Sequence, residues 1–400
     1  MRKLRYIALY LLLQTSSSGM VCAQDAGSIA ATSSGGTALS EEIVRDVTQS
    51  VGLASDPPAG DDGKEEGGVD VNELVFGHIG DSYEWHIVSF GDTHISIPLP
   101  VIVYSSTGLH VFSSSNITGG EEYEGLYIAR GGAFDGKIVE RNAAGEEVRP
   151  FDISITKNVL GLFINSAVLL VIVMSCVHWY KRHTVEHGVP KGGVGMMEAL
   201  ILMIYEDVIK GCVGENYRRY APYLLTAFFF VLVNNLMGLI PVFPGGANVT
   251  GNIAVTMVLA LCTFIMTNLF GTKEYWKEIF WPDVPIWLKV PIPMMPLIEF
   301  FGTLTKPFAL MIRLFANIMA GHASILSLIA IIFITVKAGS VINGSMTVVA
   351  VLFGIFMDAL EVLVAFIQAY VFTMLSAVFF GLSQVKGHGS EKAGLKKQKV

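Results

Sequence analysis

Charged side chains are scarce in this 400-residue chain, and that scarcity limits what the protein can be. Asp, Glu, Lys and Arg make up 15% of the residues, against roughly 25% in a typical soluble protein. Hydrophobic residues make up 52%, and the mean hydropathy is +0.55. These values exclude a disordered chain and argue against an entirely soluble enzyme.

Cysteine and basic residues are both scarce in the N-terminal third of the chain. Residues 24–150 contain no cysteine and therefore no disulfide framework. They hold 21 acidic and 6 basic residues, a net charge of −15, whereas residues 151–400 hold 13 and 18, or +5. Nucleic acid is not an expected partner, because the acidic part would repel phosphates and the basic part is too apolar. The composition predicts an acidic soluble segment joined to a membrane segment.

Residues 1–23 are typical of a secretory signal peptide. Three basic residues precede the apolar run Tyr6–Leu13, and Val21-Cys22-Ala23 resembles a cleavage site. The alternative is a retained membrane anchor. The apolar run is too short for that, since the hydrocarbon core of a bilayer is about 30 Å thick.

Two further regions precede the first long apolar run. Residues 24–75, rich in Gly, Ser, Ala and acidic residues, are predicted to form a flexible acidic linker. Residues 76–150 are predicted to form a small β-rich extracytoplasmic domain. The strand-like segments are Trp85–Val88, His94–Ile97, Val101–Tyr104 and His110–Phe112. His78, His86 and His94 recur every eight residues, but without a cysteine or a close histidine pair they are interpreted as strand or surface residues rather than metal ligands.

Residues 151–385 are predicted to form the membrane domain of an all-α polytopic membrane protein. The five predicted spans are Val159–Val177, Tyr223–Ile240, Ile253–Phe270, Leu297–Val336 and Thr347–Ser383. Met196–Tyr220 carries too many charges to span and is predicted to be an interfacial helix. The two outer loops contain Lys337 alone, whereas every inner segment carries three or more Lys or Arg. This asymmetry predicts an N-terminus outside, a C-terminus inside and a basic cytoplasmic tail over residues 386–400.

The last two apolar stretches are too long for upright spans. Leu297–Val336 is 40 residues long, or about 60 Å if helical, which is twice the hydrocarbon thickness. Gly321 is the only helix breaker between Phe308 and Thr335. We therefore predict one long slanted helix here, and a second over Thr347–Ser383.

Charged and polar residues form a stripe on the first of these helices. At 100° per residue, Glu299, Lys306, Arg313 and Asn317 share one face. A charge at mid-membrane costs about 2.5–3.5 kcal/mol, so such residues persist mainly where they line an aqueous path or meet a partner. The alternatives are a buried structural ion pair or, for Lys306, a side chain that reaches the interface.

The polar turn between the two helices predicts which residues meet. Folding the hairpin about Val341–Ile342 places His322 level with Glu361, towards the outer side. The same fold places Arg313 level with Gln368 and Tyr370.

Several motifs resemble those of the a subunit of F-type ATP synthases. The most specific is Ile312–His322, which is similar to the arginine-helix motif of that family. Gln368–Phe372, Asn234–Pro241, Asn252–Thr256 and Leu304–Pro307 resemble further signatures. The resemblance covers about residues 159–385.

The resemblance implies a role for each matching residue. Arg313 would be the stator arginine facing the rotor ring, with Asn317 and Gln368 beside it. His322 and Glu361 would belong to the outer proton half-channel and Glu299 to the inner one. Further lining residues would be Asn235, Asn252, Asp358 and Tyr370. Many bacterial members carry Glu at the position of His322 and His at that of Glu361, so the pair is exchanged here.

The implied function is that of a non-catalytic, proton-translocating stator subunit. Its partners would be membrane lipid, the c-ring of the rotor, a b-type peripheral stalk and, through that stalk, the catalytic head. We expect no cofactor, and a location in the cell inner membrane with the N-terminal domain in the periplasm. The alternative is a stand-alone secondary transporter or ion channel, which predicts inverted repeats and broken helices that the sequence does not show. A membrane-anchored receptor would leave Arg313, His322 and Glu361 unexplained. Proton and sodium coupling both remain open.

Overall fold

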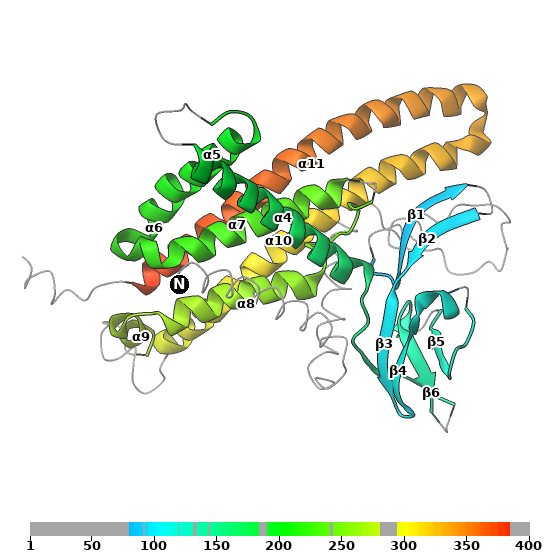
Figure 1. Ribbon diagram of the computed structural model, residues 1–400, viewed down its shortest axis with the longest axis horizontal. Helices are drawn as coiled ribbons and strands as arrows, with labels where there is room; N and C mark the ends of the chain where they lie inside the picture. Colours follow the sequence, from blue (N-terminus) through cyan, green and yellow to red (C-terminus); the bar gives the residue numbers. More distant parts are fainter. Residues whose placement is uncertain are drawn as a thin grey trace, which may run out of the picture.

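The computed structural model describes residues 80–90, 93–118, 120–130, 134–142, 145–183, 190–240, 243–280 and 294–384. The predicted signal peptide, linker and basic tail, and His78, lie outside these residues. A small β region stands at one end of a bundle of long helices (Figure 1).

The β region contains three small antiparallel sheets, with strand orders β1-β2, β4-β3-β8 and β5-β6-β7. The strands are β1 (Glu84–Phe90), β2 (Thr93–Pro98), β3 (Pro100–Ser105), β4 (Gly108–Ser113), β5 (Leu126–Ile128), β6 (Ile138–Arg141), β7 (Glu147–Val148) and β8 (Phe151–Asp152). The four predicted strands are confirmed as β1 to β4, although β8 lies just beyond the predicted boundary at residue 150. Val101 and Val103 alternate along β3 and pack against Leu126 and Ile138 in a separate small core.

Among the described residues, no group of three or more His, Cys, Asp or Glu side chains could hold a metal ion. His78 and the side chains of His86 and His94 lie outside this part of the structure, so the interpretation of their spacing stays a prediction. His86 lies on β1 and His94 on β2, as the strand interpretation predicts.

The rest of the described chain is helical. The helices are α4 (Lys157–Arg182), α5 (Gly193–Met203), a π-helical segment (Ile204–Lys210), α6 (Gly211–Val213), α7 (Tyr217–Leu239), α8 (Ile253–Leu269), α9 (Lys273–Phe280), α10 (Met294–Ile334) and α11 (Ser340–Ser383). Within the described residues, four helical stretches are long and apolar enough to cross a membrane: Lys157–Arg182, Gly193–Leu239, Pro296–Ile334 and Val341–Ser383. Helix α8 is apolar but shorter. The protein is therefore a multi-pass membrane protein.

The predicted interfacial helix has a different end from the one expected. The prediction covers Met196–Tyr220, but the last α-helical turn ends at Val213, a 3-10 turn follows over Gly214–Asn216, and Tyr217 already begins α7. Gly214 separates them with φ of 77°, a backbone conformation that only glycine adopts readily. The distribution of charged residues in this segment gives no sign of the helix break at Gly214.

The two long helices are confirmed. Helix α10 has 41 residues and α11 has 44, so each is about 60 Å long or slightly more. The turn between them was predicted at Val341–Ile342 and lies instead at Thr335–Gly339. Gly339 takes φ of 101°, and the chain reverses there because glycine tolerates this conformation. The polar residues between the two helices predicted a turn that is a few residues too far along the chain.

The helical core lies where α7 meets the α10–α11 hairpin (Figure 1). Phe228 on α7, Leu314 on α10 and Phe372 and Phe380 on α11 are almost fully buried there. Trp85 of β1 is also buried, and its ring centroid lies 5.3 Å from that of Phe243, in the α7–α8 connection. This contact attaches the β region to the helices.

Candidate functional site

His322 of α10 and Glu361 of α11 face each other across the hairpin. Their closest atoms, His322 Nδ1 and Glu361 Oε1, are 3.7 Å apart, and the two side chains are 19% and 5% exposed. The prediction that they lie level is thus confirmed. A Cβ atom on Gly321 would come within 2.7 Å of Glu361 Oε1, so the missing side chain leaves room for the carboxyl group. On the other side, His322 Nε2 lies beside Gly238 of α7.

A second polar pair crosses the same hairpin. Asn317 Nδ2 donates a hydrogen bond of 3.1 Å to Gln368 Oε1, and Gln368 is buried. Arg313 lies one helical turn before Asn317, and both residues are exposed. Tyr370, predicted to be level with Arg313, packs against the helical core.

Arg313 faces away from the rest of the chain. In the part of the chain that the structure describes, its guanidinium has no ion-pair or hydrogen-bond partner. Nearby exposed residues on α10, such as Leu304 and Phe308, are large and apolar. A permanent positive charge on such a surface is costly in lipid unless a partner with negative charge meets it.

Asparagines lead from the start of α4 to this hairpin. Asn158 and Asn165 are seven residues apart and so share a face of α4. Asn165 Nδ2 donates to Asn234 Oδ1 of α7 at 3.0 Å. The next residue, Asn235, donates through Nδ2 to the backbone oxygen of Ala365 on α11 at 3.3 Å. Ala365 is one turn from Glu361.

These buried side chains carry oxygen atoms without partners. Asn158 Oδ1, Asn165 Oδ1, Asn235 Oδ1 and both carboxyl oxygens of Glu361 are buried and lack a hydrogen bond within the described residues. Buried polar atoms are nearly always bonded to protein or to ordered water. The row of unpaired oxygens therefore fits a hydrated path. Sequence reasoning named Asn235 as a lining residue and Asn234 only as part of a motif, and it missed Asn158 and Asn165. The seven-residue spacing on α4 was the available signal for these two.

A separate small pocket lies near the other end of α10, and several polar side chains reach its mainly apolar lining. It is lined by residues of four helices, among them Thr263, Tyr275, Thr303 and Lys306. Glu299 is one turn before Thr303, whose hydroxyl donates to the Glu299 backbone oxygen at 3.0 Å. Burial raises the pKa of Tyr275, the nearby Thr303 side chain acts against this shift, and the charge of Glu299 adds to it.

Lys306 approaches an aromatic ring at this pocket. Its Nζ lies 5.8 Å from the ring centroid of Phe379 on α11. The ammonium group thus remains at the pocket, within cation–π range of that ring.

Two further predicted lining residues are Asn252 and Asp358. Asn252 is the N-cap of α8, where its Oδ1 accepts a hydrogen bond from the Ala254 backbone N–H at 2.9 Å. Asp358 is exposed, one turn before Glu361 on α11.

Comparison with known proteins gives matches over both regions. A family model described as "ATP synthase A chain" matches residues 162–381. A model described as "Domain of unknown function (DUF8433)" matches residues 74–156.

Individual relatives cover more of the chain. The chain is 42% identical to "ATP synthase subunit a" of Chlorobium phaeobacteroides over 69% of this chain and 80% of the relative. It is 41% identical to "ATP synthase subunit a 2" of Prosthecochloris aestuarii over 73% and 91%. The match to "ATP synthase subunit a" of Myxococcus xanthus is 38% identical over 61% and 77%.

Proposed function

Because the chain belongs to the ATP synthase A chain family, we propose that it forms two proton half-channels and holds an essential arginine between them. Members of this family are membrane-embedded stator subunits that work with the c-ring and the rest of the complex. In this proposal some residues transfer the proton, and others prevent it from passing directly between the half-channels.

The observation that carries the proposal is the row of buried unpaired oxygens from Asn158 to Glu361. Water that satisfies them would connect the start of α4 with the His322–Glu361 pair. We assign this path to the outer half-channel. A proton would pass from His322 and Glu361 to a carboxylate on a neighbouring rotor subunit. Once neutral, that carboxyl group can turn through lipid, which a carboxylate cannot do without a large desolvation cost.

Arg313 separates the two half-channels. Its guanidinium stays charged at any relevant pH and lies exposed on α10. It favours the ionised form of an approaching rotor carboxylate and so promotes proton release. It also repels a proton that would cross directly from one half-channel to the other. Asn317 and Gln368, bonded to each other, would keep this surface polar beside it.

The pocket around Thr303 and Lys306 fits the inner half-channel. After a nearly complete rotation, the rotor carboxyl would lose its proton towards Glu299, which adjoins this pocket. The transmembrane potential contributes about 2.3 kcal/mol per charge per 100 mV to this transfer.

The topology is part of the proposal. Helix α8 would supply the fifth span, although its 17 residues give a length of only about 25 Å. The β region would lie in the periplasm and the C-terminus in the cytoplasm of a cell with an inner membrane, in line with the basic residues Lys181 and Arg182 at the end of α4. A b-type peripheral stalk would connect the subunit to the catalytic head.

Purification combined with cross-linking tests this function. The tagged chain should copurify with a ring of small subunits and a nucleotide-hydrolysing head. A photoreactive residue in place of the exposed Ala309, one turn before Arg313, should cross-link to a ring subunit. The same residue in place of Val171, which is exposed on α4, is the control and should not. A chain that purifies alone and transports ions alone would show a stand-alone transporter instead.

A further inference from the structure

One side of the sheet β4-β3-β8 is a bare apolar face. Tyr104, Leu109 and Val111 are 60–64% exposed, and Phe151 and Ile153 are 40% and 41% exposed. Tyr104 pairs with Leu109 on one side and with Phe151 on the other, so these side chains are neighbours on one surface. None of the five is charged. We call these five residues the bare face.

The opposite side of the same sheet is covered. Val101 and Val103 are fully buried against Leu126 of β5 and Ile138 of β6. The sheet therefore has one side in the core of the β region and the bare face on the other. Apolar patches of this kind mark contacts with a partner or a membrane.

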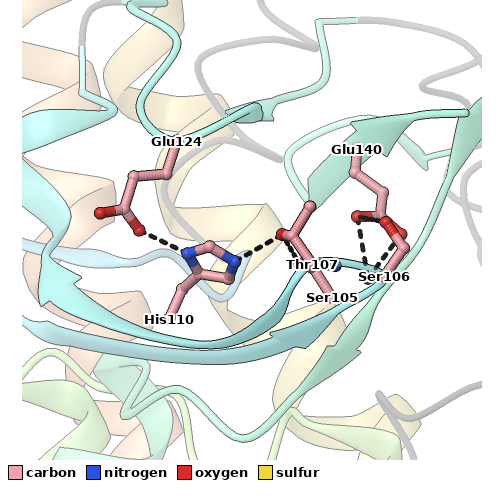
Figure 2. A network of polar contacts seen from close by, with 6 residues as sticks. All are labelled: Ser105, Ser106, Thr107, His110, Glu124 and Glu140. Carbon is pink, nitrogen blue, oxygen red and sulfur yellow. Dashed lines mark hydrogen bonds and ion pairs between the residues drawn. The ribbon is translucent and has the colours of Figure 1, made fainter.

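Polar contacts hold the β3–β4 hairpin tip from the covered side (Figure 2). The His110 ring lies between Glu124, which pairs with Nδ1, and the Thr107 hydroxyl, 2.7 Å from Nε2. Glu140 of β6 accepts hydrogen bonds from the backbone N–H and the hydroxyl of Ser106. These bonds fix the hairpin to the rest of the β region and present the bare face as a rigid surface.

The bare face is joined to the first membrane helix through β8. Only four residues separate β8 from Lys157, the first residue of α4. Phe151 thus lies at most about 20 Å from Lys157 even if the link is fully extended. Ile155, within this link, packs against the helical core. The apolar surface therefore continues from the helices towards the bare face.

The bare face is also on the side of the sheet that lies towards the helices. In Figure 1, β3 and β4 stand between the helices on one side and β5 and β6 on the other. Since β5 and β6 cover the far side of the sheet, the bare face looks towards the side from which the helices extend. Exposed residues on α4, such as Phe163 and Val171, are apolar as well.

We propose that the bare face rests on the membrane surface at the N-terminal end of α4, with Tyr104, Leu109 and Val111 entering the headgroup region. Apolar residues with a tyrosine among them are typical of this interface. The β region would then be held to the bilayer at two points, the start of α4 and the β3–β4 hairpin. A lipid surface is favoured over a protein partner because the bare face continues the apolar surface of the first membrane helix and carries no charge.

Site-directed spin labelling tests the proposal on the full chain in the assembled complex, reconstituted in liposomes. The native cysteines are replaced, and single cysteines are introduced as Leu109→Cys and, independently, Val111→Cys. Val148→Cys is the control, because Val148 is also apolar and is 40% exposed, but lies on β7 of the sheet that covers the other side. The readout is accessibility to oxygen, which concentrates in lipid, and to a water-soluble nickel chelate.

Labels at 109 and 111 should favour oxygen and lose access to the nickel chelate, whereas the label at 148 should show the reverse. Preferred access to nickel at both 109 and 111 would overturn the proposal and leave the face in water. Protection from both reagents would overturn it as well, since protein would then cover the face. Assembly of the complex is a separate measurement, so failure here does not depend on the proposed function.

Discussion

Exchanging His322 and Glu361 with each other tests whether the two residues act as one relay. Their closest atoms are 3.7 Å apart, and two unit charges at about that distance interact by roughly 4 kcal/mol at an effective dielectric constant near 20. Residues in such contact typically show coupling energies of about 0.5–3 kcal/mol. Expressed as rates, the effect of changing both residues should differ from the product of the two single effects by about 2-fold to 160-fold.

His322→Ala and Glu361→Ala should each slow proton uptake severely, because each leaves the other group without its partner. The double exchange His322→Glu with Glu361→His should recover much of the rate, since it restores one acid and one imidazole at the same depth.

The assay is passive proton flux through the membrane sector in vesicles, with complex levels checked by blotting. Ser327→Ala is a matched control on α10, because its hydroxyl bonds only to the backbone of its own helix, and it should leave the flux unchanged. A double exchange no faster than the slower single variant would refute the relay. Glu361 would then be a structural residue.

Three further changes probe the path. Gly321→Ala places a Cβ 2.7 Å from Glu361 Oε1, an overpacking that costs about 1–3 kcal/mol, so proton flux should fall at normal assembly; unchanged flux would argue against a fixed carboxyl position. Asn165→Leu removes the bond to Asn234 and should also slow flux, and a variant as fast as the parent would place the water path elsewhere. Deletion of residues 25–75 should leave flux intact; its loss in an assembled complex would mean that this acidic segment gathers ions.

The pairing of His322 with Glu361 could be predicted by counting along α10 and α11, which each run without a break, from a centre at Val341–Ile342. Counting from the observed turn at Gly339 would place residue 356 opposite His322, so uniform helical geometry alone does not account for the pairing. The turn itself depends on the conformation of Gly339, which polarity does not report. Gly214 ends the interfacial helix for the same reason.

The asparagine path could not be predicted in the same way. An uncharged Asn in an apolar helix is as compatible with an internal hydrogen bond as with a channel. Which of the two applies depends on the face that the neighbouring helix presents, as for Asn165 and Asn234. The exposure of Arg313 likewise follows from the packing of α10 against α8 and α11, and not from its spacing within the motif.

ATP-driven proton pumping by the Arg313→Ala complex in inverted vesicles tests the central claim most directly. We expect the Arg313→Ala complex to assemble and its head to hydrolyse ATP, but to pump no protons. Arg313→Lys should fail too, because an ammonium group is a compact charge that cannot spread its donors as the guanidinium does. Substantial pumping by the assembled Arg313→Ala complex would contradict the assignment of Arg313 as the charge that separates the two half-channels.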